Sequence, residues 1–235
     1  MMKRWIRALV VLPVLFMVGC ATTHDTTYLE PLHTADLHSI LIVPVNNNTI
    51  DVQAPTSVLA TLPFVLAEKG YYVFPVHTVK TLLDAEGYYE AAEVHAAPSE
   101  ALAALFGADS ILYVTIHEWE ARYAILATTT EVDFEYKLVS AAGETLWEAR
   151  KGLMYSPQNQ NSSGNIFADM IAMAITAAIE RAAPNYLPLT RQANHEVFNG
   201  GITGLPPGPN HPEYQNYYRQ IRATQGATAK EKSEE

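Results

Sequence analysis

The sequence predicts an α/β fold, more closely α+β, with one domain whose mixed sheet of about five strands is packed against helices. Three patterns predict it. The apolar run SILIVPV at 39–45 is typical of a strand buried on both faces. Helical patterns that end at glycines follow this run, and from residue 111 to 155 apolar and polar residues alternate as in antiparallel strands. The expected order is β-α-β-α-α-β-β-β-α, in which crossover helices make the first strand pair parallel.

The first half of the chain predicts a strand, a helix, a second strand and two more helices. Residues 55–69 form one helix that stops at Gly70, and Pro63 within it predicts a kink or a split. The second strand covers 71–76, and the next two helices, at 78–87 and 97–109, each close at a glycine. The apolar stripe expected on the first helix consists of Val58, Leu62, Val65 and Leu66.

The second half predicts an antiparallel meander and a helix. Residues 111–126 form a long strand or a bent pair, further strands cover 130–139 and 145–155, and the helix covers 165–183. A register that places Leu138 opposite Trp147 also places Lys137 opposite Glu148 and Glu135 opposite Arg150. Apolar and charge complementarity therefore agree on one hairpin register.

The start of the chain predicts a lipoprotein signal peptide at 1–19. Three basic residues precede an apolar run that ends at Gly19 and Cys20, the only cysteine of the 235 residues. The sequence Met17-Val18-Gly19-Cys20 resembles a bacterial lipobox, which implies that Cys20 carries the lipid. Multiple acyl chains make a stable anchor, since each buried methylene contributes ~0.8 kcal/mol. Ala21 after the cysteine favours the outer membrane by analogy with enteric bacteria.

The mature chain divides by composition into four parts. Residues 20–37 are polar and Thr-rich, which predicts a flexible linker from the lipidated cysteine. Residues 38–183 form the globular α/β domain. Residues 184–222 are a Pro/Gly/Tyr-rich extension, expected to wrap over the domain or lie loose, and 223–235 are a disordered tail.

The charge of the chain argues against nucleic acid as a partner. Removing residues 1–19 takes away three of the 15 basic residues and none of the 25 acidic ones, so the formal charge becomes −13. Such a surface repels phosphate backbones.

No catalytic, cofactor-binding or metal-binding site is predicted. Glu131, Asp133 and Glu135 share one strand face about 6–7 Å apart, a separation that can serve acid/base chemistry, but strand alternation alone explains them. His117 and Trp119 are expected on a common strand face, without the second histidine of a zinc-protease motif.

Tyrosines provide the candidate interaction surface. The chain has 13 of them, and tyrosine is enriched at protein interfaces. The residues expected to contribute lie in GYYE at 87–90 and EYQNYYRQ at 213–220, namely Tyr88, Tyr89, Tyr214, Tyr217 and Tyr218. The alternative is that these tyrosines hold the extension against its own domain.

Residues 16–221 resemble the DUF799 family of bacterial lipoproteins of unknown function. The residues that carry the resemblance are the lipobox, the stretch ILIVPVNNNTIDVQAPTSVLATLPFVLAEKGYYVFPV, LFGADSILYVTIHEW and GLPPGP. The GAD turn is also similar to that of the TolB amino-terminal domain and of curli-secretion lipoproteins. The resemblance implies an envelope module beside a curli-channel-like lipoprotein, and it supplies no catalytic residues.

The sequence therefore predicts a non-enzymatic binding or assembly lipoprotein of the outer membrane that faces the periplasm. Its expected partners are the lipid bilayer, through Cys20, and envelope proteins, with a homo-oligomer as a further arrangement. No cofactor is expected. Two alternatives stay open: an envelope hydrolase that uses the acidic strand face, and a periplasmic module that binds a small ligand.

Overall fold

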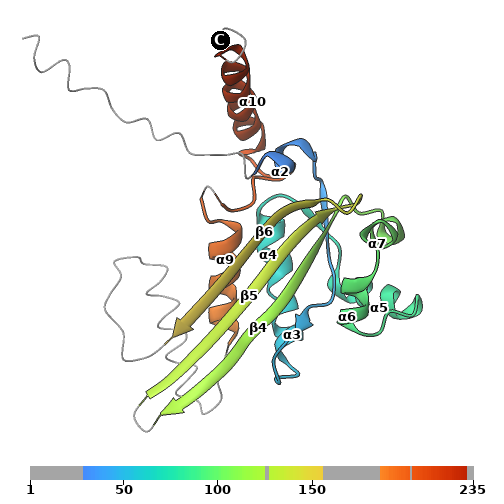
Figure 1. The fold of residues 1–235 in the computed structure, drawn as a ribbon, viewed down its shortest axis with the longest axis vertical. Helices are drawn as coiled ribbons and strands as arrows, with labels where there is room; N and C mark the ends of the chain where they lie inside the picture. Colours follow the sequence, from blue (N-terminus) through green and yellow to red (C-terminus); the bar gives the residue numbers. More distant parts are fainter. Residues whose placement is uncertain (1–28, 125–126, 156–185, 202, 232–235) are drawn as a thin grey trace, which may run out of the picture.

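The computed structural model describes residues 29–124, 127–155, 186–201 and 203–231. A six-stranded mixed sheet forms the centre, in the order β3-β1-β4-β5-β6, with β2 beside β4 (Figure 1). The predicted fold class is confirmed. The strands are β1 (Ser39–Ile42), β2 (Asn46–Asn47), β3 (Tyr72–Val73), β4 (Ser110–Ala124), β5 (Ala127–Ser140) and β6 (Thr145–Tyr155). The helices are α2 (Glu30–Thr34), α3 (Ala54–Leu59), α4 (Leu62–Glu68), α5 (Val76–Ala85), α6 (Ala91–Ala96), α7 (Ser99–Phe106), α9 (Leu187–Phe198) and α10 (Tyr214–Glu231).

The parallel part of the sheet is interrupted at a proline. β1 and β2 both run parallel to β4, and Pro44 lies between them. Because proline has no N–H to donate to the ladder, the strand predicted at 39–45 ends at Ile42, and β2 follows just beyond the predicted range. β3 is also shorter than the predicted 71–76, with two paired residues beside β1.

The antiparallel meander has the register that the sequence predicted. Leu138 pairs with Trp147 and Lys137 with Glu148, and the Lys137 Nζ lies 2.9 Å from a Glu148 oxygen. The partner of Arg150 differs from the prediction. Arg150 stands opposite Glu135, but its guanidinium bonds the carboxylate of Asp133 at 2.6 Å.

A β-bulge at His117 explains that difference. The pairing shifts between Ile116 and Glu118, which leaves His117 as the extra residue of β4. Ile116 and Trp119 are therefore both buried, whereas His117 Nε2 lies 2.8 Å from a Glu135 carboxylate oxygen on the opposite face. The expectation that His117 and Trp119 share a face is wrong, because alternation cannot reveal an inserted residue.

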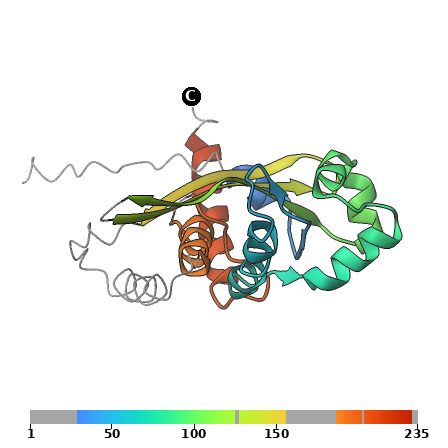
Figure 2. The ribbon, with the colours of Figure 1, turned by 90° about the horizontal axis from the view of Figure 1, so that it is seen from below.

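One face of the sheet is covered by α3, α4 and α9, which lie together below it in Figure 2. The predicted helix 55–69 is divided into α3 and α4, with Pro63 in the first turn of α4 where its missing N–H costs nothing. The core side chains include the four predicted stripe residues of these helices. The largest fully buried ones are Trp147, Tyr136, Phe134 and Phe198, whose rings contact one another edge-on or tilted.

The other face is only partly covered. Helices α5, α6 and α7 pack on β1 and the start of β4 through a second cluster of buried side chains that includes Leu41, Val79 and Leu102. In Figure 2 they gather at one end of the sheet, which leaves the long strands of the meander open on this side. Charged side chains of these strands, such as Lys137, Glu148 and Arg150, pair with one another or with Asp133. The sequence missed α6, which begins with a capping box formed by Glu90 and Glu93.

Both ends of the described chain pack on the domain more extensively than composition predicted. Leu29, Leu32 and Leu37, within the expected linker, are buried in the core. In the expected extension, α9 is a core helix and Gly204–Gly208 are buried. Residues up to Glu231 form α10, where a disordered tail was expected from 223. The predicted helix 165–183 lies outside the described residues.

Candidate protein-binding surface

The predicted tyrosines separate into two groups. Tyr214, Tyr217 and Tyr218 begin α10, beside α2, whereas Tyr88 and Tyr89 precede α6 (Figure 1). The structure does not bring these groups together, so they cannot form one surface. Cys20, the predicted lipid attachment residue, lies outside the described residues.

The first group attaches α10 to the domain. His33 Nε2 lies 2.9 Å from the Tyr217 hydroxyl, and the His33 ring contacts Tyr218 edge-on at 6.0 Å between centroids. Burial lowers the pKa of His33, so the ring is neutral in this setting, and burial raises the pKa of Tyr217 and Tyr218. These tyrosines pin the C-terminal helix, which is the alternative that the sequence left open.

The second group includes an exposed side chain. Tyr88 packs partly against the second core cluster, whereas 66% of Tyr89 is exposed. The Lys80 ammonium, which also pairs with Asp84, bonds the Tyr89 carbonyl at 3.3 Å and fixes the backbone there. Tyr89 therefore offers its ring to solvent from a fixed position.

Tyr89 lies beside a loop that sequence reasoning missed as a functional feature. In residues 46–53, the side chains of Ile50 and Val52 are 101% and 86% exposed. An exposed aliphatic residue is ordinary when it is alone, but clustered exposed apolar groups mark interaction sites. The available signal was the presence of these two apolar residues within the polar stretch NNNTIDVQ.

The 46–53 loop is held in shape by its own polar groups. Asn47 Nδ2 donates to the Asp51 carbonyl at 2.9 Å, and Asn47 Oδ1 accepts from the Thr49 hydroxyl at 2.8 Å. The Asp51 carboxylate accepts the Gln53 N–H at 2.8 Å, and the Asn48 N–H donates to Ile116 of β4 at 3.0 Å. A partner would therefore meet a preorganised loop, which lowers the entropy cost of binding.

A groove of about 720 Å³ runs between this loop and the helices α3, α5 and α6. Its lining includes Val52, Pro55, Leu59, Val76 and Tyr89. Several of its polar groups are already bonded within the protein, such as Lys80 to Asp84 and Glu90 within the α6 capping box. The loop and groove, called here the Ile50 surface, therefore present apolar side chains beside polar groups of which several are already paired.

The acidic strand face does not have the geometry of a hydrolase. Asp133 is bonded by Arg150, and Glu135 by His117. The hydrogen bond from Arg150 to Asp133 raises the pKa of the guanidinium above its usual range. Both carboxylates are therefore committed to partners within the sheet, whereas a glycosidase needs a carboxyl group that is free to protonate the leaving group. Glu131 contributes to the same open face without a buried environment.

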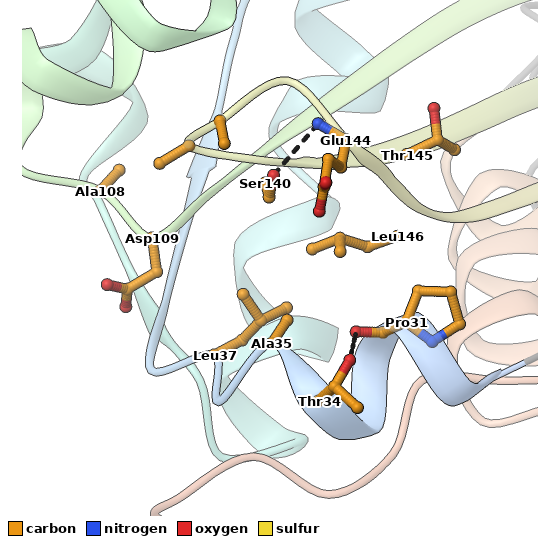
Figure 3. A pocket seen from close by; sticks show the side chains of 12 residues that line it. Pro31, Thr34, Ala35, Leu37, Ala108, Asp109, Ser140, Glu144, Thr145 and Leu146 are labelled. Atoms are coloured by element: carbon orange, nitrogen blue, oxygen red, sulfur yellow. Dashed lines mark hydrogen bonds between the residues drawn. The ribbon is translucent and has the colours of Figure 1, made fainter.

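A second cavity, of about 760 Å³, lies between α2 and the β5–β6 turn (Figure 3). Its walls are largely small apolar side chains, and its polar groups serve local structure. Ser140 Oγ accepts the Glu144 N–H at 3.1 Å, and the Thr34 hydroxyl donates to the Pro31 carbonyl at 3.1 Å, as the dashed lines show. Asp109 holds the Ser39 hydroxyl at 2.8 Å. This cavity offers a small ligand few uncommitted polar groups.

The described residues contain no group of three or more His, Cys, Asp or Glu side chains arranged to hold a metal ion. Among the helices that the structure describes, none has both the length and the apolar character needed to cross a bilayer.

Comparison with known proteins identifies the family. The family model described as "Putative lipoprotein GNA1162-like" matches residues 28–210, most of the chain. The chain belongs to the GNA1162-like lipoprotein family. The resemblance to a bacterial lipoprotein family is thereby confirmed, and the DUF799 name and the likeness to TolB and curli-secretion modules stay predictions.

Two proteins from Neisseria meningitidis are similar to this chain. "Putative lipoprotein NMB1124/NMB1162" of serogroup B is 38% identical over 125 residues, which are 53% of this chain and 58% of the relative. The chain thus spans little more than half the length of that curated relative. The crystal structure of lipoprotein GNA1162 is 34% identical, with a TM-score of 0.51, over 62% of this chain and 99% of that one. Membership in the GNA1162-like family implies a lipid-anchored envelope protein.

Proposed function

We propose that the protein is a non-enzymatic binding or assembly component of the bacterial envelope, anchored in the outer membrane by Cys20 and facing the periplasm. The observation that carries the proposal is the Ile50 surface. It combines two highly exposed aliphatic side chains, a loop braced by hydrogen bonds and an adjoining groove. The paired carboxylates of the meander argue against the hydrolase that the sequence left open.

The position of the Ile50 surface favours a protein over the membrane as its partner. The described chain begins at Leu29, nine residues after Cys20, directly before α2 at the upper end in Figure 1. The loop before α3 lies toward the other end, away from α2. The expected partner is an envelope protein that inserts apolar side chains into the groove. The resemblance stated from the sequence favours a curli-channel-like lipoprotein, and a homo-oligomer is a second arrangement.

The partner is tested by crosslinking in cells, followed by purification in mild detergent and mass analysis. Ile50→Ser/Val52→Ser is expected to abolish capture of a defined envelope protein or of a second copy. Because both side chains are exposed, the free energy of unfolding should change by no more than about 0.5 kcal/mol. Phe64→Ser is the matched control, since Phe64 is 69% exposed on α4 and does not line the groove. Equal capture by the double variant, or no companion for the unmodified chain, would overturn the proposal.

The anchor is tested separately. Cys20→Ser is expected to abolish labelling of the protein by fatty acids in cells, because the sequence has no other thiol to receive a lipid. Ser162→Ala, which lies in the polar stretch QNQNSS, is the control and should label normally. Unchanged labelling of Cys20→Ser would contradict the anchor.

A further inference from the structure

Helix α10 differs in charge from the rest of the molecule. It contains three basic residues, Arg219, Arg222 and Lys230, and one acidic residue, Glu231 at its end, which gives a formal charge of +2, whereas the whole chain has a formal charge of −10. Arg219 and Arg222 are exposed, and neither guanidinium forms a hydrogen bond or ion pair with another described residue. The helix is therefore a cationic element on an anionic protein.

The attachment of α10 places this charge where the chain enters the domain. Tyr217 and Tyr218 hold the base of the helix against His33 of α2. In Figure 1, α10 rises beside α2 and projects beyond the sheet. The acidic residues close to its base are Glu30, which acts on His33, Asp36, which acts on Tyr218, and Glu213, which directly precedes the helix, whereas Arg219 and Arg222 follow farther along it.

The length of the tether is compatible with contact between α10 and the bilayer. Nine residues lead from Cys20 to Leu29, and a fully extended chain of that length spans at most about 30 Å. The 18 residues of α10 measure about 27 Å along the helix axis. A membrane anchored at Cys20 thus lies within reach of the whole helix.

We infer that α10 binds the anionic surface of the membrane in which the lipid is anchored, with Arg219 and Arg222 contacting lipid phosphates. This inference rests on the proposed anchor at Cys20. Two membrane contacts, one acyl and one electrostatic, hold the domain in a fixed orientation with the Ile50 surface directed away from the bilayer. Near an anionic surface an arginine or lysine contributes about a fivefold gain in binding, equivalent to ~1 kcal/mol.

The test uses the mature chain from residue 20 with Cys20→Ser, so that no acyl chain contributes, and sedimentation with lipid vesicles. At low salt the protein is expected to bind phosphatidylglycerol vesicles and not phosphatidylcholine vesicles. Arg222→Gln should weaken binding about fivefold, and Arg219→Gln/Arg222→Gln about 25-fold. Raising the salt concentration should weaken binding further, because exposed charges are screened.

Arg191→Gln is the matched control, because Arg191 is exposed on α9 and its loss changes the net charge by the same amount as Arg222→Gln. Binding that is equal for both lipids, or weakened as much by Arg191→Gln, would overturn the inference. A dimer that forms without vesicles and requires Arg219 and Arg222 would also overturn it, because a second copy would then occupy α10. Fatty-acid labelling at Cys20 is measured independently, so failure here leaves the anchor intact.

Discussion

Gly70→Ala is expected to destabilise the protein by about 2–4 kcal/mol, because alanine is strained in the backbone conformation of Gly70 and would also clash. Gly70 has a φ of +89°, and a Cβ atom there would lie 2.9 Å from the Cα of His211 and closer still to its backbone nitrogen. The backbone segment that follows Leu205 would have to move away. Urea unfolding measures the loss, and limited proteolysis should show earlier release of the C-terminal segment.

Gly87→Ala is the control that separates strain from collision. Gly87 has nearly the same φ, +91°, but a Cβ atom there would meet nothing within 4 Å. Gly87→Ala should lower the free energy of unfolding by only about 1–2 kcal/mol, which is the penalty for alanine in a left-handed conformation. Equal losses for the two variants would contradict the close packing of the C-terminal segment on Gly70. Gly208→Ala should destabilise the protein through collision alone, since its φ is not positive but its Cβ would lie 2.8 Å from the Gly70 carbonyl carbon.

Asn194→Ala is expected to lower the free energy of unfolding by about 3 kcal/mol. The substitution leaves the buried Tyr136 hydroxyl without its acceptor and opens a small cavity. Asn194 is 1% exposed on α9, and its Oδ1 accepts the Tyr136 hydroxyl at 2.7 Å. Its Nδ2 donates to the Thr61 hydroxyl at 2.8 Å, so one amide joins α9, β5 and the start of α4. Thermal or urea unfolding measures the change.

A double-mutant cycle makes this prediction specific. If the hydrogen bond from Tyr136 to Asn194 carries the loss, Tyr136→Phe/Asn194→Ala should cost clearly less than the sum of the two single substitutions. Asn199→Ala, just beyond α9, is the matched control and should have little effect. A negligible cost for Asn194→Ala would mean that 187–198 is the loose extension that composition predicted.

The hairpin was predictable because it depends on neighbours in the sequence. Alternation fixes which face each residue occupies, and the pairs Leu138–Trp147 and Lys137–Glu148 leave one register that satisfies both faces. The bulge at His117 was not predictable, since neither the composition nor the alternation of the strand shows that one of its residues is unpaired. The bulge brings His117 within hydrogen-bond distance of Glu135, and the Arg150 guanidinium pairs with Asp133 instead.

The two ends of the chain were misjudged for one physical reason. The Thr-rich segment at the start and the Pro/Gly-rich segment at the end show no periodicity, so their sequences resemble linkers. In the structure, individual contacts with residues far away in the sequence hold them against the domain. Trp147 Nε1 donates to the Thr203 carbonyl at 2.8 Å, and the Tyr71 hydroxyl donates to the Pro206 carbonyl at 3.0 Å. Leu29 and Leu32, three residues apart, were the readable sign that a short buried helix follows the tether.

The sequence predicted one part of the candidate surface and missed the other. Tyrosine enrichment led to Tyr89, but it also led to Tyr217 and Tyr218, which hold α10 in place. Residue type alone cannot distinguish a tyrosine that binds a partner from one that packs against its own domain. Ile50 and Val52 became recognisable only once the fold showed them exposed on a braced loop.

The contacts that join the C-terminal segment to the domain are also expected to form late in folding. The bond between Tyr71 and Pro206 joins residues 135 apart in sequence, and the contact between His33 and Tyr217 joins residues 184 apart. Contacts of such separation form late, since the entropy of closing a long loop must be overcome first. An incomplete chain that ends before residue 200 lacks these contacts, and its core is open at Tyr71. Under the proposed export behind a signal peptide, late closure keeps the polypeptide unfolded, and so able to cross the inner membrane, until its last segments have been synthesised.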